Sequence, residues 1–179
     1  MKLSQDELIT HCLDGDSHAL NELYNRYSPK LWGICLRYAK NEMSAEDIMQ
    51  EGFIRIYRYL EHYKGKGSFE GWMRRTMVNT AINYYKKNLR TGNESQFDEA
   101  YGVSSTSADA ISVLSTEEIL KLVSKMPDGY RTVFNMYVVD GYSHKEIAEE
   151  LKISENTSKS QLSRARSFLK EKVNNLYKS

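Results

Sequence analysis

The sequence predicts an all-α protein of two small helical domains joined by a flexible acidic linker, with a helix-turn-helix in the C-terminal domain. Three observations lead to this prediction. The 179 residues include only two prolines, and the apolar residues show no sustained alternation of the kind that indicates strands. Residues 91–115 are rich in Ser, Thr, Gly, Asp and Glu and lack helical periodicity, which is typical of a linker. We therefore expect domains at residues 1–90 and 116–179.

Five helices are expected in the N-terminal domain. Ser4 precedes two acidic residues and suits a helix start. Asp16 opens a helix over residues 17–27, and Pro29 suits the first turn of a separate helix that ends near residue 40. A fourth helix begins at residues 44–47, and a long fifth helix extends from residue 68 or 69 to about residue 89. The fourth helix has one apolar stripe at helical spacing, formed by Ile48, Phe53, Ile56, Tyr57 and Leu60.

Four helices are expected in the C-terminal domain, at residues 116–125, 128–139, 143–151 and 154–177. Ser143 and Glu146 match a capping box. Ser154 is a candidate N-cap, and the carboxylate of Glu155 suits the positive end of the helix dipole. Two short helices around a tight corner predict a helix-turn-helix over residues 142–168.

Charge is segregated along the chain, although the formal net charge is only +1. Residues 1–51 carry a net charge of −4, and residues 71–90 contain five basic and no acidic residues. Residues 93–118 contain six acidic and no basic residues, and residues 154–179 carry a net charge of +4. Two basic blocks therefore lie on either side of an acidic connector, a pattern that predicts strong local fields.

The sequence gives no support to catalysis. The four histidines are scattered, and no metal-ligand pair, Walker-type glycine loop or nucleophile elbow occurs. Cys12 and Cys35 lie in apolar surroundings, which favours buried thiols in a reducing compartment over a disulfide. No signal pattern is present, and no apolar run approaches the roughly 18 residues of a membrane span. We expect a cytoplasmic protein without membrane insertion that is not an enzyme and holds no metal or cofactor.

The last helix is the first candidate for binding DNA. Residues that can form a core shared with the preceding helix are Ile147, Ala148, Leu151, Ile153, Leu162, Ala165 and Leu169. The opposite, exposed face then carries Asn156, Lys159, Ser160, Ser163, Arg164 and, at its edge, Arg166. Such side chains bind guanine edges, other base edges or phosphates. The alternative is an ordinary solvated basic helix in a helical hairpin.

The helix over residues 71–90 is the second candidate. Its polar positions are Arg74, Arg75, Asn79, Asn83, Lys86 and Lys87. A basic, amide-bearing face beside Phe69, Trp72 and Tyr84 suits a phosphate track with unstacked bases. The alternative is an amphipathic core helix whose aromatic side chains are simply buried, which is the usual fate of a helical stripe.

The helix that starts near residue 44 carries acidic and amide side chains at one end. Asp47, Gln50 and Glu51 could dock a basic protein partner. The alternative is a solvated face with weak intrahelical ion pairs.

Three segments together resemble bacterial RNA polymerase sigma factors of the extracytoplasmic-function (ECF) group, in the sigma-70 family. The segment AEDIMQEGFIRIY resembles the helix that binds core polymerase. The segment GSFEGWMRRTMVNTAINYYKK resembles the part that melts the promoter and reads the minus-ten element. The segment MPDGYRTVFNMYVVDGYSHKEIAEELKISENTSKSQLSRARSFLK resembles the region-four helix-turn-helix that reads the minus-35 element. Their order, with a linker between the second and third, makes the resemblance specific.

The resemblance implies a role for each site. It places Asp47, Gln50, Glu51 and Phe53 on the surface that grips the largest core subunit. It places Asn79 where a flipped minus-ten base is contacted, with the loop over residues 63–69 helping to set base specificity. It implies that the last helix reads the minus-35 element. In this recognition helix many members carry arginine where this chain has Lys159 and Gln161. The full set of predicted minus-35 residues is Asn156, Lys159, Ser160, Gln161, Ser163, Arg164 and Arg166.

The resemblance also implies partners: core RNA polymerase, promoter DNA as duplex and as melted strand, and an anti-sigma factor. The resemblance further implies that the linker threads toward the active centre and RNA exit path of the polymerase, where its six carboxylates and absence of cations would suit a basic channel. From charge alone, a second possibility is that the linker folds over the two basic blocks and suppresses DNA binding in the free protein. The alternative hypotheses are a conventional helix-turn-helix regulator, which binds promoter DNA without polymerase, and an anti-sigma-like or adaptor protein, which would not need the basic helix over residues 71–90.

Overall fold

The computed structural model describes residues 3–90 and 116–176. Every regular element within these two ranges is helical, as the sequence predicts. The chain divides into two compact units, Met1–Tyr84 and Tyr85–Ser179, and the division falls inside the long helix α4. The acidic linker, with its two predicted roles, lies outside the described residues.

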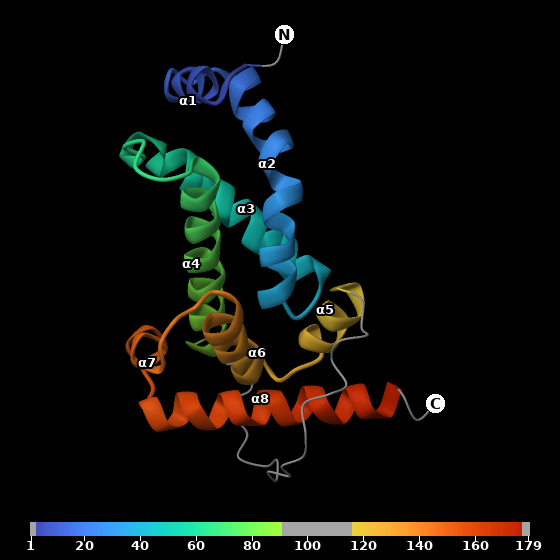
Figure 1. Cartoon of the computed structure of the whole chain (residues 1–179). Helices are drawn as coiled ribbons and strands as arrows, with labels where there is room; N and C mark the ends of the chain where they lie inside the picture. Colours follow the sequence, from blue (N-terminus) through green and yellow to red (C-terminus); the bar gives the residue numbers. More distant parts are fainter. Residues whose placement is uncertain (1–2, 91–115, 177–179) are drawn as a thin grey trace. The chain divides into compact units, whose positions relative to one another are not determined.

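The first unit is built from four α-helices and a short 3₁₀ helix. Helix α1 crosses one end of α2 and α3 packs against α2, while α4 completes the unit (Figure 1). The bounds are α1 Gln5–Leu13, α2 Ser17–Tyr38, α3 Glu42–Tyr59, the 3₁₀ helix η1 Leu60–His62, and α4 Phe69–Arg90. The start of α3 differs from the prediction by two residues, because Asn41 is its N-cap and accepts a hydrogen bond from the Ser44 backbone N–H at 2.9 Å.

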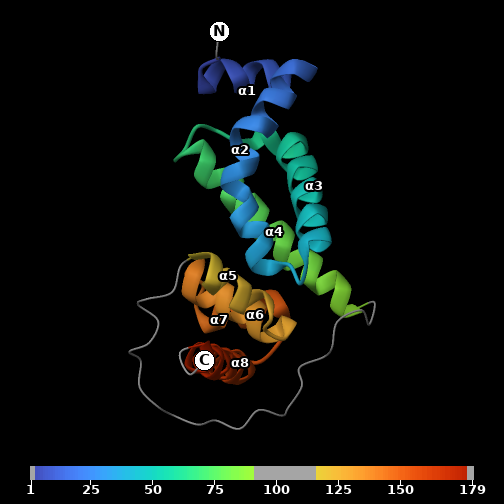
Figure 2. The same ribbon diagram turned by 90° about the vertical axis from the view of Figure 1, so that its right-hand side faces the viewer.

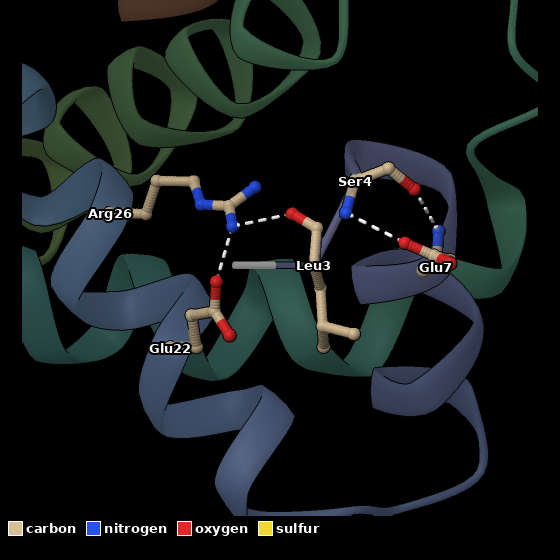
Figure 3. A network of polar contacts seen from close by, with 5 residues as sticks. All are labelled: Leu3, Ser4, Glu7, Glu22 and Arg26. Carbon is tan, nitrogen blue, oxygen red and sulfur yellow. Dashed lines mark hydrogen bonds and ion pairs between the residues drawn. The ribbon is translucent and has the colours of Figure 1, made fainter. Parts of the chain in front are cut away.

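The start of α1 is fixed by two sets of polar contacts (Figure 3). Ser4 and Glu7 form a reciprocal capping box, in which the Ser4 N–H donates to Glu7 at 2.8 Å and the Glu7 N–H donates to the Ser4 hydroxyl at 3.3 Å. Arg26 of α2 donates to the Leu3 carbonyl at 2.8 Å and pairs with Glu22 one turn away. The predicted helix start at Ser4 is therefore confirmed, and Arg26 ties it to α2.

One predicted boundary in this unit is wrong. Residues 17–38 form the single helix α2, with Pro29 inside it, instead of two helices separated before Pro29. Proline removes a backbone donor and disfavours a helix interior, but its ring here is exposed. The buried side of α2 continues unbroken through Leu23, Tyr27 and Leu31, so packing against the core overrides the local preference.

The core of the first unit lies between α2, α3 and α4. Leu31, Ile48 and Met77 are fully buried or nearly so. Cys12 and Cys35 are buried free thiols. Burial raises the pKa of Cys12 to about 11 and that of Cys35 to about 12, so both thiols are protonated and unreactive near neutral pH.

The second unit places three short helices against one long helix, which Figure 2 shows end-on. Its bounds are α5 Thr116–Ser124, α6 Asp128–Phe134, the π-helix η3 Asn135–Val139, α7 His144–Leu151 and α8 Glu155–Leu176. The predicted helix over residues 128–139 is present, but its last five residues are wound as a π-helix. Both predicted caps are confirmed: Ser143 forms a capping box with Glu146, and the Ser154 hydroxyl accepts from the Thr157 N–H at 3.0 Å.

Helices α5, α6 and α8 share one apolar cluster, formed by Leu122, Val123, Met126, Tyr130, Ala165, Leu169 and Val173. Beside it, Arg131 is 1% exposed. Its guanidinium donates to the carbonyls of Met126 at 3.0 Å and Ser124 at 3.3 Å and pairs with the buried carboxylate of Asp128. A buried arginine is tolerated only with such partners, and here they join the end of α5 to α6.

Candidate functional site

The exposed side of α3 carries the predicted docking residues. Asp47, Gln50 and Glu51 are all exposed there, within one turn of each other. Phe53 is different, because its ring is 3% exposed and lies 4.7 Å from the ring of Tyr24 and 5.8 Å from that of Tyr57. In this conformation Phe53 supports α3 from inside the core and presents no surface to a partner.

The polar groups of this face have neighbours within the first unit. Glu51 pairs with Arg55 one turn later, at 2.9 Å between Oε1 and Nε. Asp47 accepts a hydrogen bond from the hydroxyl of Tyr84 on α4 at 3.2 Å. Gln50 borders a cleft of about 510 Å³ between α2 and α3, lined also by Tyr24, Ser28, Pro29, Trp32, Glu46 and Met49. An acidic edge above an aromatic and thioether floor suits a basic or amide side chain from a protein partner.

Helix α4 presents the predicted basic and amide face. Arg75, Asn79 and Asn83 recur every four residues and are exposed along one side. Of the remaining predicted residues, Arg74 and Lys87 are exposed and Lys86 is half-buried. The opposite side of α4 is the core side, with Met73, Met77, Val78, Ala81, Ile82 and Tyr85 buried.

Aromatic rings gather at the start of α4. Phe69 is fully buried and lies 5.8 Å from Trp72 in a stacked arrangement, with interplanar angle 13°. Tyr63 lies 5.0 Å from Phe69 and 5.7 Å from Trp72, and its hydroxyl donates to the Gly67 carbonyl at 2.9 Å. Tyr63 and Trp72 remain half-exposed. Of the predicted aromatic platform, then, Phe69 belongs to the core and Trp72 keeps an accessible surface.

A second cleft, of about 460 Å³, opens beside these rings. It is lined by Gln5, Tyr27, Lys30, Ser68, Phe69, Glu70, Gly71 and Arg74. Lys30 Nζ lies 2.6 Å from Glu70 and 5.5 Å from the centre of the Tyr27 ring. Sequence reasoning missed Gln5, Tyr27 and Lys30, because they reach this place only through the packing of α1 and α2 against the start of α4.

The helix-turn-helix is formed by α7 and α8. The corner is made by Lys152, which takes the left-handed conformation with φ of 57° at the C-cap of α7. Such a residue ends a helix sharply. Most residues of α8 that are predicted to contact DNA are accessible: Asn156, Lys159, Ser160, Ser163 and Arg166 are exposed, and Arg164 is half-buried.

Gln161 does not lie on the exposed side of α8. It is 1% exposed, and its Oε1 has no hydrogen-bond partner among the described residues. It follows buried Ser158 by three residues and precedes buried Ala165 by four, so helical spacing puts all three on the core side. This spacing was readable from the sequence, and contact of Gln161 with DNA would require α8 to turn about its axis.

The described residues thus offer one acidic face and two basic, amide-bearing faces. Nowhere in residues 3–90 and 116–176 does a group of His, Cys, Asp and Glu side chains gather as metal ligands would. Over the same ranges, no helix combines the length and the apolar character needed to cross a membrane.

Comparison with known proteins identifies two family regions. Residues 23–91 match Sigma-70 region 2, and residues 116–169 match Sigma-70 region 4. The solved structure of the sigma factor RpoE with the anti-sigma factor NepR from Bartonella quintana has TM-score 0.48 and 18% identity, over 84% of this chain and 94% of that one.

Two curated relatives match over nearly the whole chain. The ECF RNA polymerase sigma-E factor of Haemophilus influenzae is 30% identical over 184 residues, which cover 96% of each protein. The ECF RNA polymerase sigma-E factor of Escherichia coli K12 is 30% identical over 183 residues, covering 96% of this chain and 95% of that protein. With both sigma regions in order and this similarity from end to end, the chain belongs to the ECF RNA polymerase sigma factors.

Proposed function

We propose that this sigma factor divides promoter recognition among the three faces described above. The exposed side of α3 docks core RNA polymerase through Asp47, Gln50 and Glu51. Phe53 contributes by holding α3 in place from the core. The acidic character of the face and the neighbouring cleft suit a basic partner surface.

Helix α4 contacts the melted minus-ten strand. Arg75, Asn79 and Asn83 form the line of contact, with Arg74, Lys86 and Lys87 supplying further positive charge. An unstacked base needs an aromatic or enclosed place and a nearby cation. The half-exposed Trp72 and the cleft beside Arg74 supply both, at the end of α4 from which this line of residues begins.

Helix α8 reads the duplex minus-35 element from its exposed side, with Asn156, Lys159, Ser160, Ser163, Arg164 and Arg166. Its first turns carry the short polar side chains that can approach base edges, as in other helix-turn-helix proteins. The two DNA-binding faces act together, because tethering both to one polymerase raises the effective concentration of each. The protein performs no covalent chemistry, acts in the cytoplasm where polymerase is found, and is held inactive by an anti-sigma factor.

The observation that carries this proposal is the separation of the acidic α3 face from the basic α4 face within one small unit. Run-off transcription with purified core polymerase over a panel of promoters tests it. The wild type should stimulate specific initiation, and Asp47→Ala/Gln50→Ala should abolish most of it. A matched control, Asn21→Ala/Glu61→Ala, removes an exposed amide and carboxylate elsewhere in the same unit and should behave as the wild type.

Two results would contradict the proposal. If the wild type stimulated none of the promoters, or bound promoter DNA equally well without polymerase, a conventional regulator would be favoured.

For α8, Arg164→Ala should weaken discrimination for the upstream element by about 1–3 kcal/mol if Arg164 reads a base. A uniform loss on every sequence would instead make Arg164 a phosphate contact.

A further inference from the structure

One histidine connects three elements of the second unit. The imidazole of His144, the first residue of α7, stacks on the ring of Tyr137 in the π-helix η3, with ring centres 4.4 Å apart and an interplanar angle of 24°. Its Nδ1 lies 2.9 Å from the hydroxyl oxygen of Ser158 in α8. The capping box of Ser143 fixes the start of α7 and so the place from which this ring projects.

Ser158 gives this contact its significance. It is fully buried, and it lies in the first turn of α8 between Asn156 and Lys159, which are on the exposed DNA-facing side. A buried hydroxyl needs a hydrogen-bond partner, and His144 is one that the structure provides. Because Ser158 and the DNA-facing residues belong to one helical turn, a constraint on Ser158 also fixes the rotation of that turn about the helix axis.

The surroundings favour the neutral ring. Burial lowers the pKa of His144 below its usual value, Lys159 and Arg166 of α8 act in the same direction, and Glu155 of the same helix opposes them. From η3, the ring of Tyr137 is the group that faces the imidazole. Because the pKa of His144 is lower in the folded chain, the unfolded chain binds a proton on this imidazole more readily. Acidification below about pH 6.5 therefore lowers the free energy of unfolding, and the stability contributed by the neutral His144 ring is fully present only above that pH.

We infer that His144 is a positioning residue for minus-35 recognition, which sets the orientation of the first turn of α8 by holding Ser158 against α7 and η3. This inference rests on the proposed function of α8. The hydroxyl can donate to Nδ1 or accept from it, so either neutral tautomer makes the bond. A protonated His144 ring places a further cation beside Lys159 and Arg166, and the repulsion destabilises the contact between His144 and Ser158.

The consequence is a loss of promoter discrimination on acidification. A protonated ring adds positive charge near the phosphates, which raises affinity for any DNA. Discrimination, expressed as the ratio of affinities for a specific and a scrambled upstream element, should therefore fall even where total DNA binding does not. His144 is the only histidine in residues 85–179, so the second unit offers no other histidine for such an effect.

The test uses the full chain bound to core polymerase. A promoter is first selected from a randomised library with wild-type holoenzyme, and a partner duplex has only its upstream element scrambled. Both affinities are measured at pH 7.5 and pH 5.8 for the wild type, His144→Asn and His144→Leu. The amide of asparagine can reach the position of Nδ1 but does not titrate, whereas leucine fills the space and leaves Ser158 without this partner.

We expect the wild-type ratio to fall severalfold from pH 7.5 to pH 5.8. His144→Asn should keep a ratio within about threefold of the wild type at pH 7.5 and lose its pH dependence. His144→Leu should lower the ratio about tenfold at pH 7.5, as expected for a buried hydroxyl left unpaired. Urea unfolding of each variant shows that it is folded; if His144→Leu is not, the wild type and His144→Asn decide the question.

Three outcomes would overturn the inference. A folded His144→Leu with the wild-type ratio would show that the contact does not position α8. A His144→Asn ratio that kept the wild-type pH dependence would assign that dependence to another group. An equal loss on both duplexes would make His144 a phosphate contact. If wild-type holoenzyme failed to distinguish the two duplexes at pH 7.5, the proposed function of α8 would itself be wrong. That result differs from the three outcomes above, in which α8 still reads the upstream element and only the role of His144 fails.

Discussion

Gly52 lies on the buried side of α3, where this helix comes close to α4, and its replacement by alanine tests the packing between them. A Cβ built at Gly52 would lie 2.4 Å from Met77 Sδ and 2.5 Å from Met77 Cε. Ordinary contacts of this kind are 3.4–4 Å, so the thioether must move by about 1 Å. Met77 is fully buried, and the displaced atoms therefore press on the surrounding core.

The magnitude follows from two opposing effects. Overpacking of a well-filled core costs about 1–3 kcal/mol, while removing a glycine from a helix interior stabilises by about 1 kcal/mol. Gly52→Ala should therefore lower the free energy of unfolding by about 1 kcal/mol. Gly33→Ala in α2 is the matched control, because an added Cβ there meets nothing within 4 Å, and it should raise that free energy by about 1 kcal/mol.

Urea unfolding followed by tryptophan fluorescence provides the assay. Both tryptophans, Trp32 and Trp72, belong to the first unit, so the signal reports on that unit. In a Met77→Ala background the clash is absent, and Gly52→Ala should become neutral or stabilising there. If Gly52→Ala stabilised the wild type as much as Gly33→Ala, or if its effect were the same in both backgrounds, the reasoning about the α3–α4 contact would be refuted.

Three further predictions concern other contacts. Arg131→Ala should lower the free energy of unfolding by about 3–5 kcal/mol, because it leaves a buried carboxylate without its cation; a loss under about 1 kcal/mol in urea unfolding followed by circular dichroism would contradict this. Tyr84→Phe and Asp47→Ala should show a coupling of about 0.5–1 kcal/mol in affinity for core polymerase, measured by a double-mutant cycle; strictly additive effects would show that their hydrogen bond has no role in docking. Lys152→Gly should leave the free energy of unfolding unchanged or raise it by up to about 1 kcal/mol, because glycine takes a left-handed conformation without steric cost. Lys152→Val should lower it by more than about 1 kcal/mol. Equal stability of the two variants would argue against the left-handed corner.

The helix starts could be predicted from the sequence because capping is local. Ser4, Ser143 and Ser154 each bind a backbone N–H three residues ahead, and such patterns are visible in a short window. The break expected before Pro29 was wrong for the opposite reason. Helix α2 stays continuous because one of its sides is buried against other helices of the unit. A local sequence pattern around Pro29 cannot predict that burial.

The candidate faces were predicted better than the clefts beside them. A face follows from spacing along one helix, so the exposed positions of α4 and α8 could be predicted. Gln161 was added to the α8 set by the family resemblance, whereas its spacing from buried Ala165 places it on the core side. The cleft near Arg74 combines residues 40 positions apart, such as Lys30 and Glu70. The contact of His144 with Ser158 likewise depends on how two helices meet, which no motif in either helix specifies.

The contacts of the buried Arg131 guanidinium limit where the chain can be divided into stable fragments. A fragment that began after residue 126 would keep the cation and Asp128 but lose the Ser124 and Met126 carbonyls to which it donates. It would also lose Leu122 and Val123 from the apolar cluster. An excised upstream-reading unit should therefore start no later than Thr116, and a chimaera that exchanges this unit between sigma factors should place its junction before α5.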